Sequence, residues 1–340
     1  MFVQYIAYFS ISGENKISIY QMDPDTGDLS LLSHVTVDGT PAPLVVDSEQ
    51  AYLYAGLRST EQIAVFEINQ SDGQLTQIGQ TKIQSNSCYI TLDQSDNFLL
   101  SAYYGAGCVS VHQIGNDKLV VADPISWIET AEHAHCVMTD PTNRYAFVPH
   151  TVEPNMICQF LFNQNTGKLM PNTVPKVIPA DGEGPRHYCH HPNKDVLYFS
   201  NEQGSSVTAY HLDADIGTLS PFQTLSTLPD DFDGPNTCAQ IHLDPTGEFL
   251  YVSNRGHDSI AIFAVNQSNG QLITVGQQPS EPTPRTFDVD PTGNFLFAGG
   301  QGSGKLATYR IDRQKGSLSP LKTYEVGQTP SWVMVLEFDV

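Results

Sequence analysis

Short stretches in which apolar residues alternate with smaller or polar ones recur seven times along the chain, and each predicts a β-strand. Most are followed by a turn such as Asp25-Thr-Gly or Ser268-Asn-Gly and then a leucine, which is typical of a hairpin leading into an outer strand. No long stretch repeats its apolar residues at the helical period, so the pattern favours an all-β chain. The seven stretches begin at Ile17, Ile63, Val109, Ile157, Val207, Ile260 and Leu306.

A second series of positions, each opening a tight turn, falls between these strands. Asp-Pro-x-Gly suits such a turn because proline presets φ, the aspartate side chain caps the turn and glycine accepts a positive φ. Each turn separates a first strand from an aromatic-rich second strand, so every repeat of about 47 residues supplies four strands. Four-stranded units at this period predict a seven-bladed β-propeller with antiparallel blades. The turns begin at Asp47, Asp93, Asp140, His191, Asp244 and Asp290.

The two ends of the chain fit the same repeat. The segment Tyr5-Ile-Ala-Tyr matches a second strand, and Trp332-Val-Met-Val-Leu matches a first strand. We therefore expect the N- and C-terminal strands to share one blade and to close the ring. No linker interrupts the repeats, so residues 1–340 are predicted to form a single propeller domain.

The acidic composition of the chain argues against some classes of binding partner. The chain has 16 basic and 37 acidic residues and a formal net charge of −21, which disfavours binding to nucleic acid or to an anionic membrane surface. Neither a signal peptide nor an apolar run long enough to span a membrane is evident. The six cysteines include no C-x-x-C pair, so reduced thiols in the cytoplasm are the simplest interpretation. A monomer or a weak homo-oligomer is expected.

Two sets of equivalent repeat positions are predicted to surround one mouth of the channel. The first and second strands of a blade form a hairpin, so the start of one and the end of the other share an edge. Four of the chain's seven arginines fall at these positions, which predicts an anion-binding mouth. The first strands begin with Ala42, Cys88, His135, Arg186, Ala239, Arg285 and, in the closing blade, Trp332. The second strands end with Arg58, Tyr104, Thr151, Glu202, Arg255 and Gln301.

Each of these side chains also has a structural interpretation. Propeller arginines often tie neighbouring blades through ion pairs, because structural networks gather charges as binding sites do. His135 can be interpreted as a hydrogen-bonded structural histidine of the first strand. Glu202 can be interpreted as the salt-bridge partner of an arginine. Tyr104, Thr151 and Gln301 are candidates for the wall of the site and for its hydrogen bonds.

The histidines invite a zinc hypothesis, which we do not favour. Alternation along a strand would place His133 and His135 on one face, as ligation requires. The run His187-x-x-His190-His191 adds three more imidazoles, but no cysteine or aspartate completes a recognisable set. We therefore predict neither a metal nor an organic cofactor.

Several short motifs stand at corresponding positions of the repeats. They are Gly184-Pro-Arg-His187, Ser200-Asn-Glu202, Ser253-Asn-Arg255, Pro284-Arg285-x-Phe287 with Asp290, and Gln301. Together these motifs resemble those of the lactonase family of seven-bladed β-propellers, in register over the whole chain, and they are more specific as a set than singly. The resemblance implies that His135, Arg186, Glu202 and Arg255 line an active site.

The resemblance implies hydrolysis of a sugar lactone, with 6-phosphogluconolactone as the expected substrate. Glu202 or His135 would act as general base, while Arg186 and Arg255 would hold the phosphate and face the developing oxyanion. Arg58 and Arg285 are further anion contacts, and Tyr104, Gln301 and His187 further contacts to the substrate. Two alternatives stay open: a lactone cycloisomerase of the carboxymuconate type, and a propeller without catalytic activity that binds a ligand or a protein.

Overall fold

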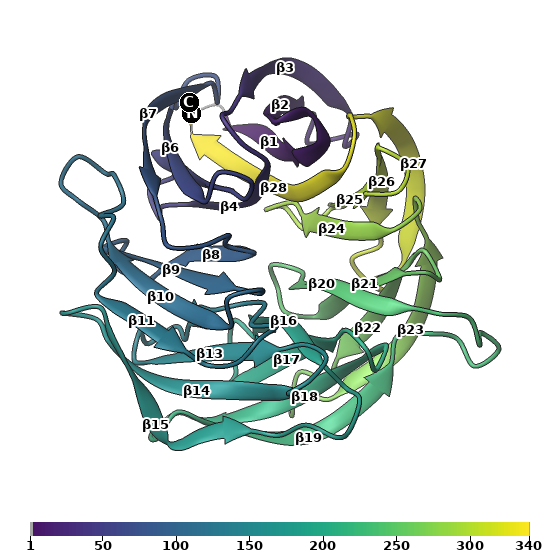
Figure 1. Ribbon diagram of the computed structural model, residues 1–340. Coiled ribbons are helices and arrows are strands. Elements are labelled where there is room, and N and C mark those ends of the chain that lie inside the picture. The colour runs from purple at the N-terminus through teal and green to yellow at the C-terminus, as the bar shows by residue number, and fades with distance from the viewer. Residues whose placement is uncertain (1–2, 340) are drawn as a thin grey trace. The chain divides into compact units, whose positions relative to one another are not determined.

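The computed structural model describes residues 3–339, and within them the chain forms twenty-eight strands and one 3₁₀ turn, η1 (Ser12–Glu14) (Figure 1). The strands make seven four-stranded sheets, each antiparallel wherever its pairing is described. This confirms the all-β class, the number of blades and the number of strands in each blade. None of the helices among these residues is long and apolar enough to cross a membrane.

The chain divides into two compact units. The first unit comprises residues 1–36, 187–211 and 221–340, and the second comprises residues 37–186 and 212–220. The prediction of one domain over residues 1–340 stays a prediction.

Three sheets lie wholly in the first unit. In the order in which they pair, their strands are β28 (Pro330–Asp339), β1 (Val3–Ile11), β2 (Lys16–Met22) and β3 (Leu29–Thr36); β20 (Thr237–Leu243), β21 (Phe249–Arg255), β22 (Ser259–Val265) and β23 (Leu272–Pro279); and β24 (Pro284–Val289), β25 (Phe295–Gly300), β26 (Lys305–Ile311) and β27 (Leu318–Glu325).

Three more sheets lie wholly in the second unit. They are β4 (Pro41–Val46), β5 (Tyr52–Leu57), β6 (Gln62–Ile68) and β7 (Leu75–Lys82); β8 (Tyr89–Leu92), β9 (Phe98–Tyr103), β10 (Cys108–Gln113) and β11 (Ser126–Glu129); and β12 (Met138–Thr139), β13 (Tyr145–His150), β14 (Met156–Asn163) and β15 (Lys168–Val177). The seventh sheet has residues in both units: β16 (Pro185–His190), β17 (Val196–Asn201), β18 (Ser206–Asp213) and β19 (Thr218–Ser226).

The burial pattern explains why the middle strands are nearly continuous apolar runs. All six residues of β9 and of β25 are buried, since both faces of such a strand are covered by protein. The fourth strands behave differently: β3 and β7 bury their first residue and expose most of the rest, as edge strands do. The apolar side chains therefore collect along the second and third strands of each blade.

The N- and C-terminal strands share one blade, as the sequence predicts. Strand β28 pairs antiparallel with β1 from Val3 opposite Asp339 to Ile11 opposite Pro330. Figure 1 shows β28 beside β1. The blade thus combines a first strand from one end of the chain with three strands from the other.

The aspartate turns form as expected. The Asp290 carboxylate accepts the backbone N–H groups of Asn294 and Phe295, at 2.9 and 2.7 Å, and so caps the turn between two strands. His191 takes over this role in the seventh sheet, where its Nδ1 accepts the N–H of Asn193 at 3.0 Å. Burial lowers the pKa of His191, which favours the neutral ring that this acceptor role requires.

Asp288 links the first strands of two sheets in the first unit and lies beside a histidine of a third. Its Oδ2 accepts the N–H of Val335 on β28 at 2.9 Å, and its Oδ1 lies 3.8 Å from Nδ1 of His242 on β20. Burial raises the pKa of Asp288 to about 7 and lowers the pKa of His242 to about 4. A third of the His242 side chain stays accessible to water, and a smaller part of Asp288 does.

These two shifts predict opposing effects on stability. A raised carboxyl pKa means that the folded state binds more protons, so the Asp288 contribution falls as pH rises from about 4 to 7. A lowered histidine pKa means the reverse, so the His242 contribution rises between about pH 4 and 6.5. The difference in unfolding free energy between Asp288→Asn and wild type should therefore move in favour of the variant as pH rises from about 4 to 7. For His242→Gln the difference should move in favour of wild type between about pH 4 and 6.5. Urea midpoints at half-unit pH intervals would show this, and parallel curves for both variants would contradict it.

Candidate active site

The ends of the second strands lie where the repeat analysis places them, beside the starts of the first strands. Arg255 at the end of β21 is paired with Thr237 at the start of β20. In the same way Gly300 opposes Pro284, and in the second unit Leu57 opposes Pro41. The two sets of predicted site positions therefore share one edge of these blades.

In the first unit, Glu202 and Arg255 form an ion pair between two adjacent blades. Nη2 of Arg255 donates to Oε1 of Glu202 at 2.8 Å and to the backbone oxygen of Cys238 at 2.8 Å. The Cys238 N–H donates in turn to the backbone oxygen of Glu202 at 3.1 Å. Cys238 thus holds both members of the pair through its own backbone.

The pair is partly accessible and keeps binding capacity. The side chains of Arg255 and Glu202 are 14% and 16% exposed, so a part of each is accessible to solvent. Within the described part of the chain, Nε of Arg255 is buried and has no hydrogen-bond partner. The exposed part of a guanidinium beside a carboxylate can contact an oxyanion while the carboxylate accepts a proton from water.

The other predicted residues of the first unit lie at the same edges of their blades. His187 on β16 is buried, and its ring centroid lies 6.3 Å from that of Trp332 near the start of β28. Arg285, the second residue of β24, is half-buried. Gln301 follows β25 directly, and its N–H donates to the carbonyl of Thr283 at 2.9 Å, which places it beside the start of β24.

In the second unit, Tyr104 packs against two histidines. Its ring centroid lies 4.7 Å from that of His133 and 5.6 Å from that of His135, the latter edge to face. His135 is buried, and its N–H donates to the Pro149 carbonyl at 3.0 Å. Thr151 is fully buried in the same region.

The expected strand alternation of His133 and His135 is wrong. His133 has a φ of 69°, which an extended strand does not allow, and the first strand of this blade is only the two residues of β12. Nδ1 of His133 is 2.7 Å from the Glu153 carbonyl, which turns this imidazole toward a loop. Among residues 3–339 no group of three histidine, cysteine or acidic side chains is arranged to hold a metal ion.

The two arginines of the second unit that the repeat positions single out differ in environment. Nε of half-buried Arg58 donates to Oδ1 of Asn86 at 2.8 Å. Arg186, the second residue of β16, is only 2% exposed and ranks first among the largest fully buried side chains. A guanidinium so deeply buried must be paired or must face a bound anion, because an isolated buried charge is costly.

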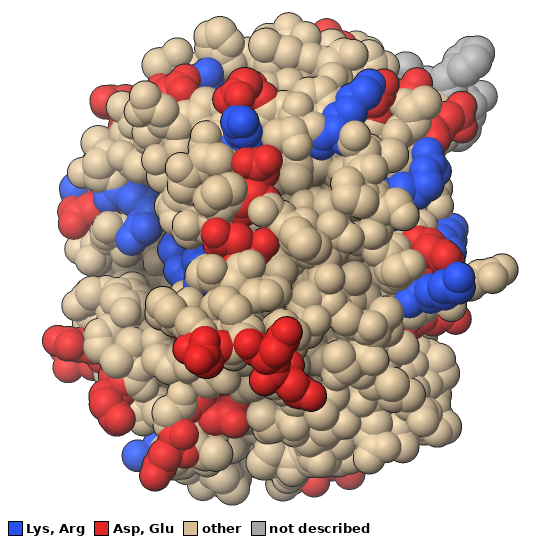
Figure 2. Space-filling model, turned by 90° about the vertical axis from the view of Figure 1, so that its right-hand side faces the viewer, with Lys and Arg blue, Asp and Glu red and all other residues tan. Residues whose placement is uncertain are grey.

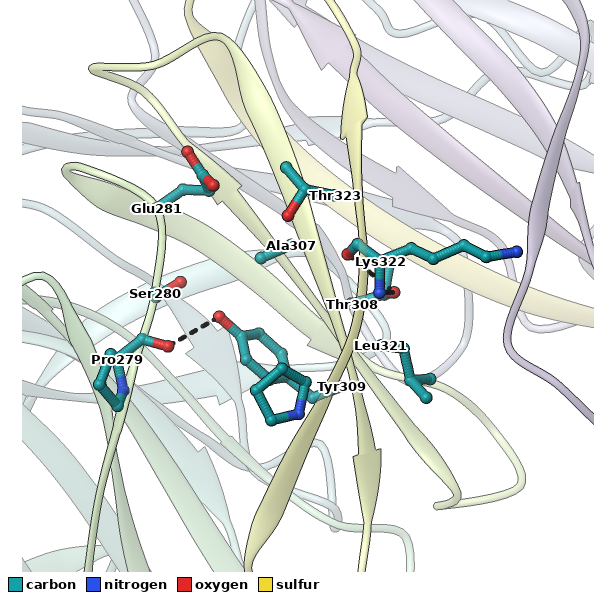
Figure 3. A pocket seen from close by; sticks show the side chains of 10 residues that line it. Pro279, Ser280, Glu281, Ala307, Thr308, Tyr309, Leu321, Lys322 and Thr323 are labelled. Carbon is teal, nitrogen blue, oxygen red and sulfur yellow. Dashed lines mark hydrogen bonds between the residues drawn. The ribbon is translucent and has the colours of Figure 1, made fainter.

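A cavity of about 260 Å³ elsewhere in the first unit does not suit an anionic substrate (Figure 3). Hydroxyl groups and the carboxylate of Glu281 line it, and the Tyr309 hydroxyl donates to the Pro279 carbonyl at 3.0 Å. Its one cationic side chain, Lys322, extends away and donates to Asp28 at 2.5 Å. No positive charge in this cavity is therefore available to a phosphate or a carboxylate.

The surface charge agrees with the composition. Figure 2 shows acidic side chains spread over the visible face, with lysine and arginine scattered among them rather than gathered in one patch. Arg186 and Arg255 are largely buried, so their charge is held inside the fold. Such arginines select an anion by close contact rather than by a long-range basic surface.

Sequence reasoning missed the residues that hold the ion pair. The backbone oxygen of Cys238 and the side chain of Asn254 belong to the same hydrogen-bonded group as Arg255. Cys238 could not be predicted from its residue type, because it contacts Arg255 through its backbone oxygen and every residue has one. Asn254 stands inside the Ser253-Asn-Arg255 motif, and that motif was its only signal.

The chain is similar to known proteins over nearly its whole length. Residues 4–335 match the family model described as "Lactonase, 7-bladed beta-propeller". The chain is 36% identical over 337 residues to a 6-phosphogluconolactonase of Pectobacterium carotovorum, covering 99% of this chain and all of that protein. It is 35% identical to one of Serratia proteamaculans, covering 97% and 98%. A periplasmic gluconolactonase structure from Pseudomonas aeruginosa superposes with a TM-score of 0.89 at 22% identity, covering 98% and 99%.

Proposed function

Because this chain belongs to the lactonase family of seven-bladed β-propellers, we propose that it hydrolyses 6-phosphogluconolactone to 6-phosphogluconate. The relatives that bear this name match nearly its whole length. The observation that carries the proposal is the partly exposed ion pair of Glu202 and Arg255. The names of these relatives do not favour the cycloisomerase alternative.

The proposed reaction needs water, a base and an oxyanion contact. Glu202 takes a proton as the water oxygen attacks the lactone carbonyl carbon, and Arg255 stabilises the negative charge that develops on the carbonyl oxygen. Collapse of the tetrahedral intermediate breaks the bond to the ring oxygen, which receives the proton back from Glu202. The product acid then ionises and releases one proton to solvent.

The remaining predicted residues are assigned to substrate binding or to an alternative base. We propose that Arg285 contacts the phosphate, because a guanidinium matches phosphate oxygens in pairs. Arg58 and Arg186, in the second unit, are proposed as anion contacts for the same chemical reason. His135 is the alternative general base. Tyr104, Gln301 and His187 are proposed to contact the sugar.

The direct test is hydrolysis of 6-phosphogluconolactone above its spontaneous rate, with gluconolactone as the substrate that lacks phosphate. We expect a higher kcat/KM for the phosphorylated lactone. Turnover of carboxymuconate without lactone hydrolysis would support the cycloisomerase instead. No turnover of any of these substrates by folded protein would overturn the proposal.

Arg285→Ala should affect the two lactones differently. Loss of a phosphate contact is expected to raise KM for 6-phosphogluconolactone about 10- to 100-fold, as loss of a hydrogen bond to a charged group does, and to leave gluconolactone kinetics within twofold. Arg313→Ala is the matched control, because exposed Arg313 donates only to the Thr292 carbonyl at 3.3 Å. An equal loss for both lactones would remove Arg285 from phosphate binding.

We further propose a cytoplasmic location. All six cysteines are thiols, five of them buried. Reduced, buried thiols are common in the cytoplasm, where disulfides rarely persist. Cell fractionation of the native source would test this, and recovery with periplasmic marker proteins would contradict it.

A further inference from the structure

A buried asparagine precedes each member of the ion pair. Asn201 ends β17 directly before Glu202, and Asn254 lies on β21 directly before Arg255. Both side chains are completely buried. Burying an amide is costly unless its hydrogen bonds are satisfied, so both positions need an explanation.

Both asparagines clamp the last pair of residues before the turn that follows. Asn254 opposes Ser259, and its Nδ2 donates to the Ser259 hydroxyl at 3.2 Å and to the Thr227 carbonyl at 3.0 Å. Asn201 likewise opposes Ser206, and its Nδ2 donates to that hydroxyl at 2.9 Å. The side chains thereby cross-link the end of the second strand to the start of the third.

Among the hairpins of residues 3–339, this asparagine–serine pair is confined to the two blades of the ion pair. Apolar side chains can occupy the same position in the fold, as buried Leu57 and Tyr103 do. A buried amide is therefore not a requirement of the hairpin itself. The equivalent last pairs in the other five described hairpins are Ile11–Lys16, Leu57–Gln62, Tyr103–Cys108, His150–Met156 and Gly300–Lys305.

The hydrogen bonds of Asn254 lead directly to the ion pair. Its Oδ1 accepts the hydroxyl of Thr227 at 2.8 Å, the amide of Asn236 at 3.1 Å and the thiol of Cys238 at 3.5 Å. The backbone oxygen of Cys238 in turn accepts a hydrogen bond from the guanidinium of Arg255. Asn254 is therefore the fully buried centre of a group of hydrogen bonds whose outermost member is Arg255.

We propose that Asn254 is a positioning residue that holds the Arg255 guanidinium against Glu202, and that Asn201 sets the backbone of Glu202 in the same way. This inference rests on the proposed lactone hydrolysis. A rigid buried amide fixes the strand end, and a fixed strand end fixes the direction of the side chain that follows. Such support matters because a shift of about 1 Å in a reacting group can lower a rate about 100-fold.

The test compares Asn254→Leu, which removes the amide and leaves no hydrogen-bonding group, with the milder Asn254→Ser, which replaces the amide by a hydroxyl. We expect Asn254→Leu to lower kcat about 100-fold and Asn254→Ser roughly tenfold, with KM within threefold for both. Asn172→Ala is the matched control, because Asn172, on the outer strand β15 of the second unit, is a similarly buried amide that donates to the backbone oxygens of Ile216 and Gly217. It should lower the midpoint of thermal unfolding and leave kcat within twofold.

A second readout does not depend on activity. The Arg255 Nε–H signal in a nitrogen-15 NMR spectrum, assigned by its loss in Arg255→Lys, reports how firmly the guanidinium is held. Its hydrogen exchange should accelerate at least tenfold in both Asn254 variants and stay unchanged in Asn172→Ala. If wild-type protein lacks lactonase activity, the proposed function fails while this readout still tests the positioning. Wild-type exchange and wild-type kcat in Asn254→Ser would overturn the positioning role.

Discussion

Glu202→Gln is expected to lower kcat for lactone hydrolysis between about 100- and 10,000-fold, the range over which general bases contribute. Glutamine keeps the size of the side chain and still accepts the Arg255 Nη2 hydrogen bond that Glu202 accepts at 2.8 Å. It cannot take a proton from water. KM should therefore change little, since the ion pair is replaced by a neutral hydrogen bond in the same geometry.

Steady-state kinetics and the thermal midpoint of the same preparation would separate loss of the base from loss of the fold. Glu281→Gln is the matched control: Glu281 is a half-buried glutamate of the first unit in the cavity that lacks available positive charge, and its variant should retain kcat within twofold. Full activity of Glu202→Gln would transfer the role of general base to His135. The His135→Gln variant would then carry the loss instead.

The repeat explains why so much of the fold is predictable from the sequence. In a turn that starts with aspartate, the carboxylate accepts backbone N–H groups of the same turn, as that of Asp290 does. The motif therefore indicates a hairpin wherever it recurs. The closing blade follows from the same periodicity, because the ends supply the strands that the repeat lacks. The contact between Glu202 and Arg255 follows too, since equivalent positions in adjacent blades lie side by side.

Repeat position does not determine what lies between strands or how deeply a side chain is buried. The segment before β12 carries a left-handed residue, His133, and no periodic signal distinguishes it from a strand. Arg186 and Arg285 stand at equivalent repeat positions, yet Arg186 is buried and Arg285 is half-buried. The Cys238 atom that accepts the Arg255 hydrogen bond is a backbone oxygen, so the amino-acid sequence does not indicate it.

Deleting residues 330–340 is expected to abolish the folded state. The deletion removes β28 and leaves β1 as an unpaired edge, although all but the first two residues of β1 are buried. Val333, Val335, Leu336 and Phe338 are each less than 9% exposed, and burial of four such side chains contributes roughly 6–12 kcal/mol, comparable to the stability of a whole domain. The truncated chain should lose its cooperative thermal transition in circular dichroism and aggregate.

A peptide of residues 330–340 should restore the transition when added in excess, because it can pair with β1 as the missing strand. Glu337→Gln is the point control, since this exposed position of β28 should alter stability by no more than about 0.5 kcal/mol. A truncated chain that still melts cooperatively near the wild-type temperature would show that the blade is stable with three strands. The pairing of the two ends would then be dispensable for folding.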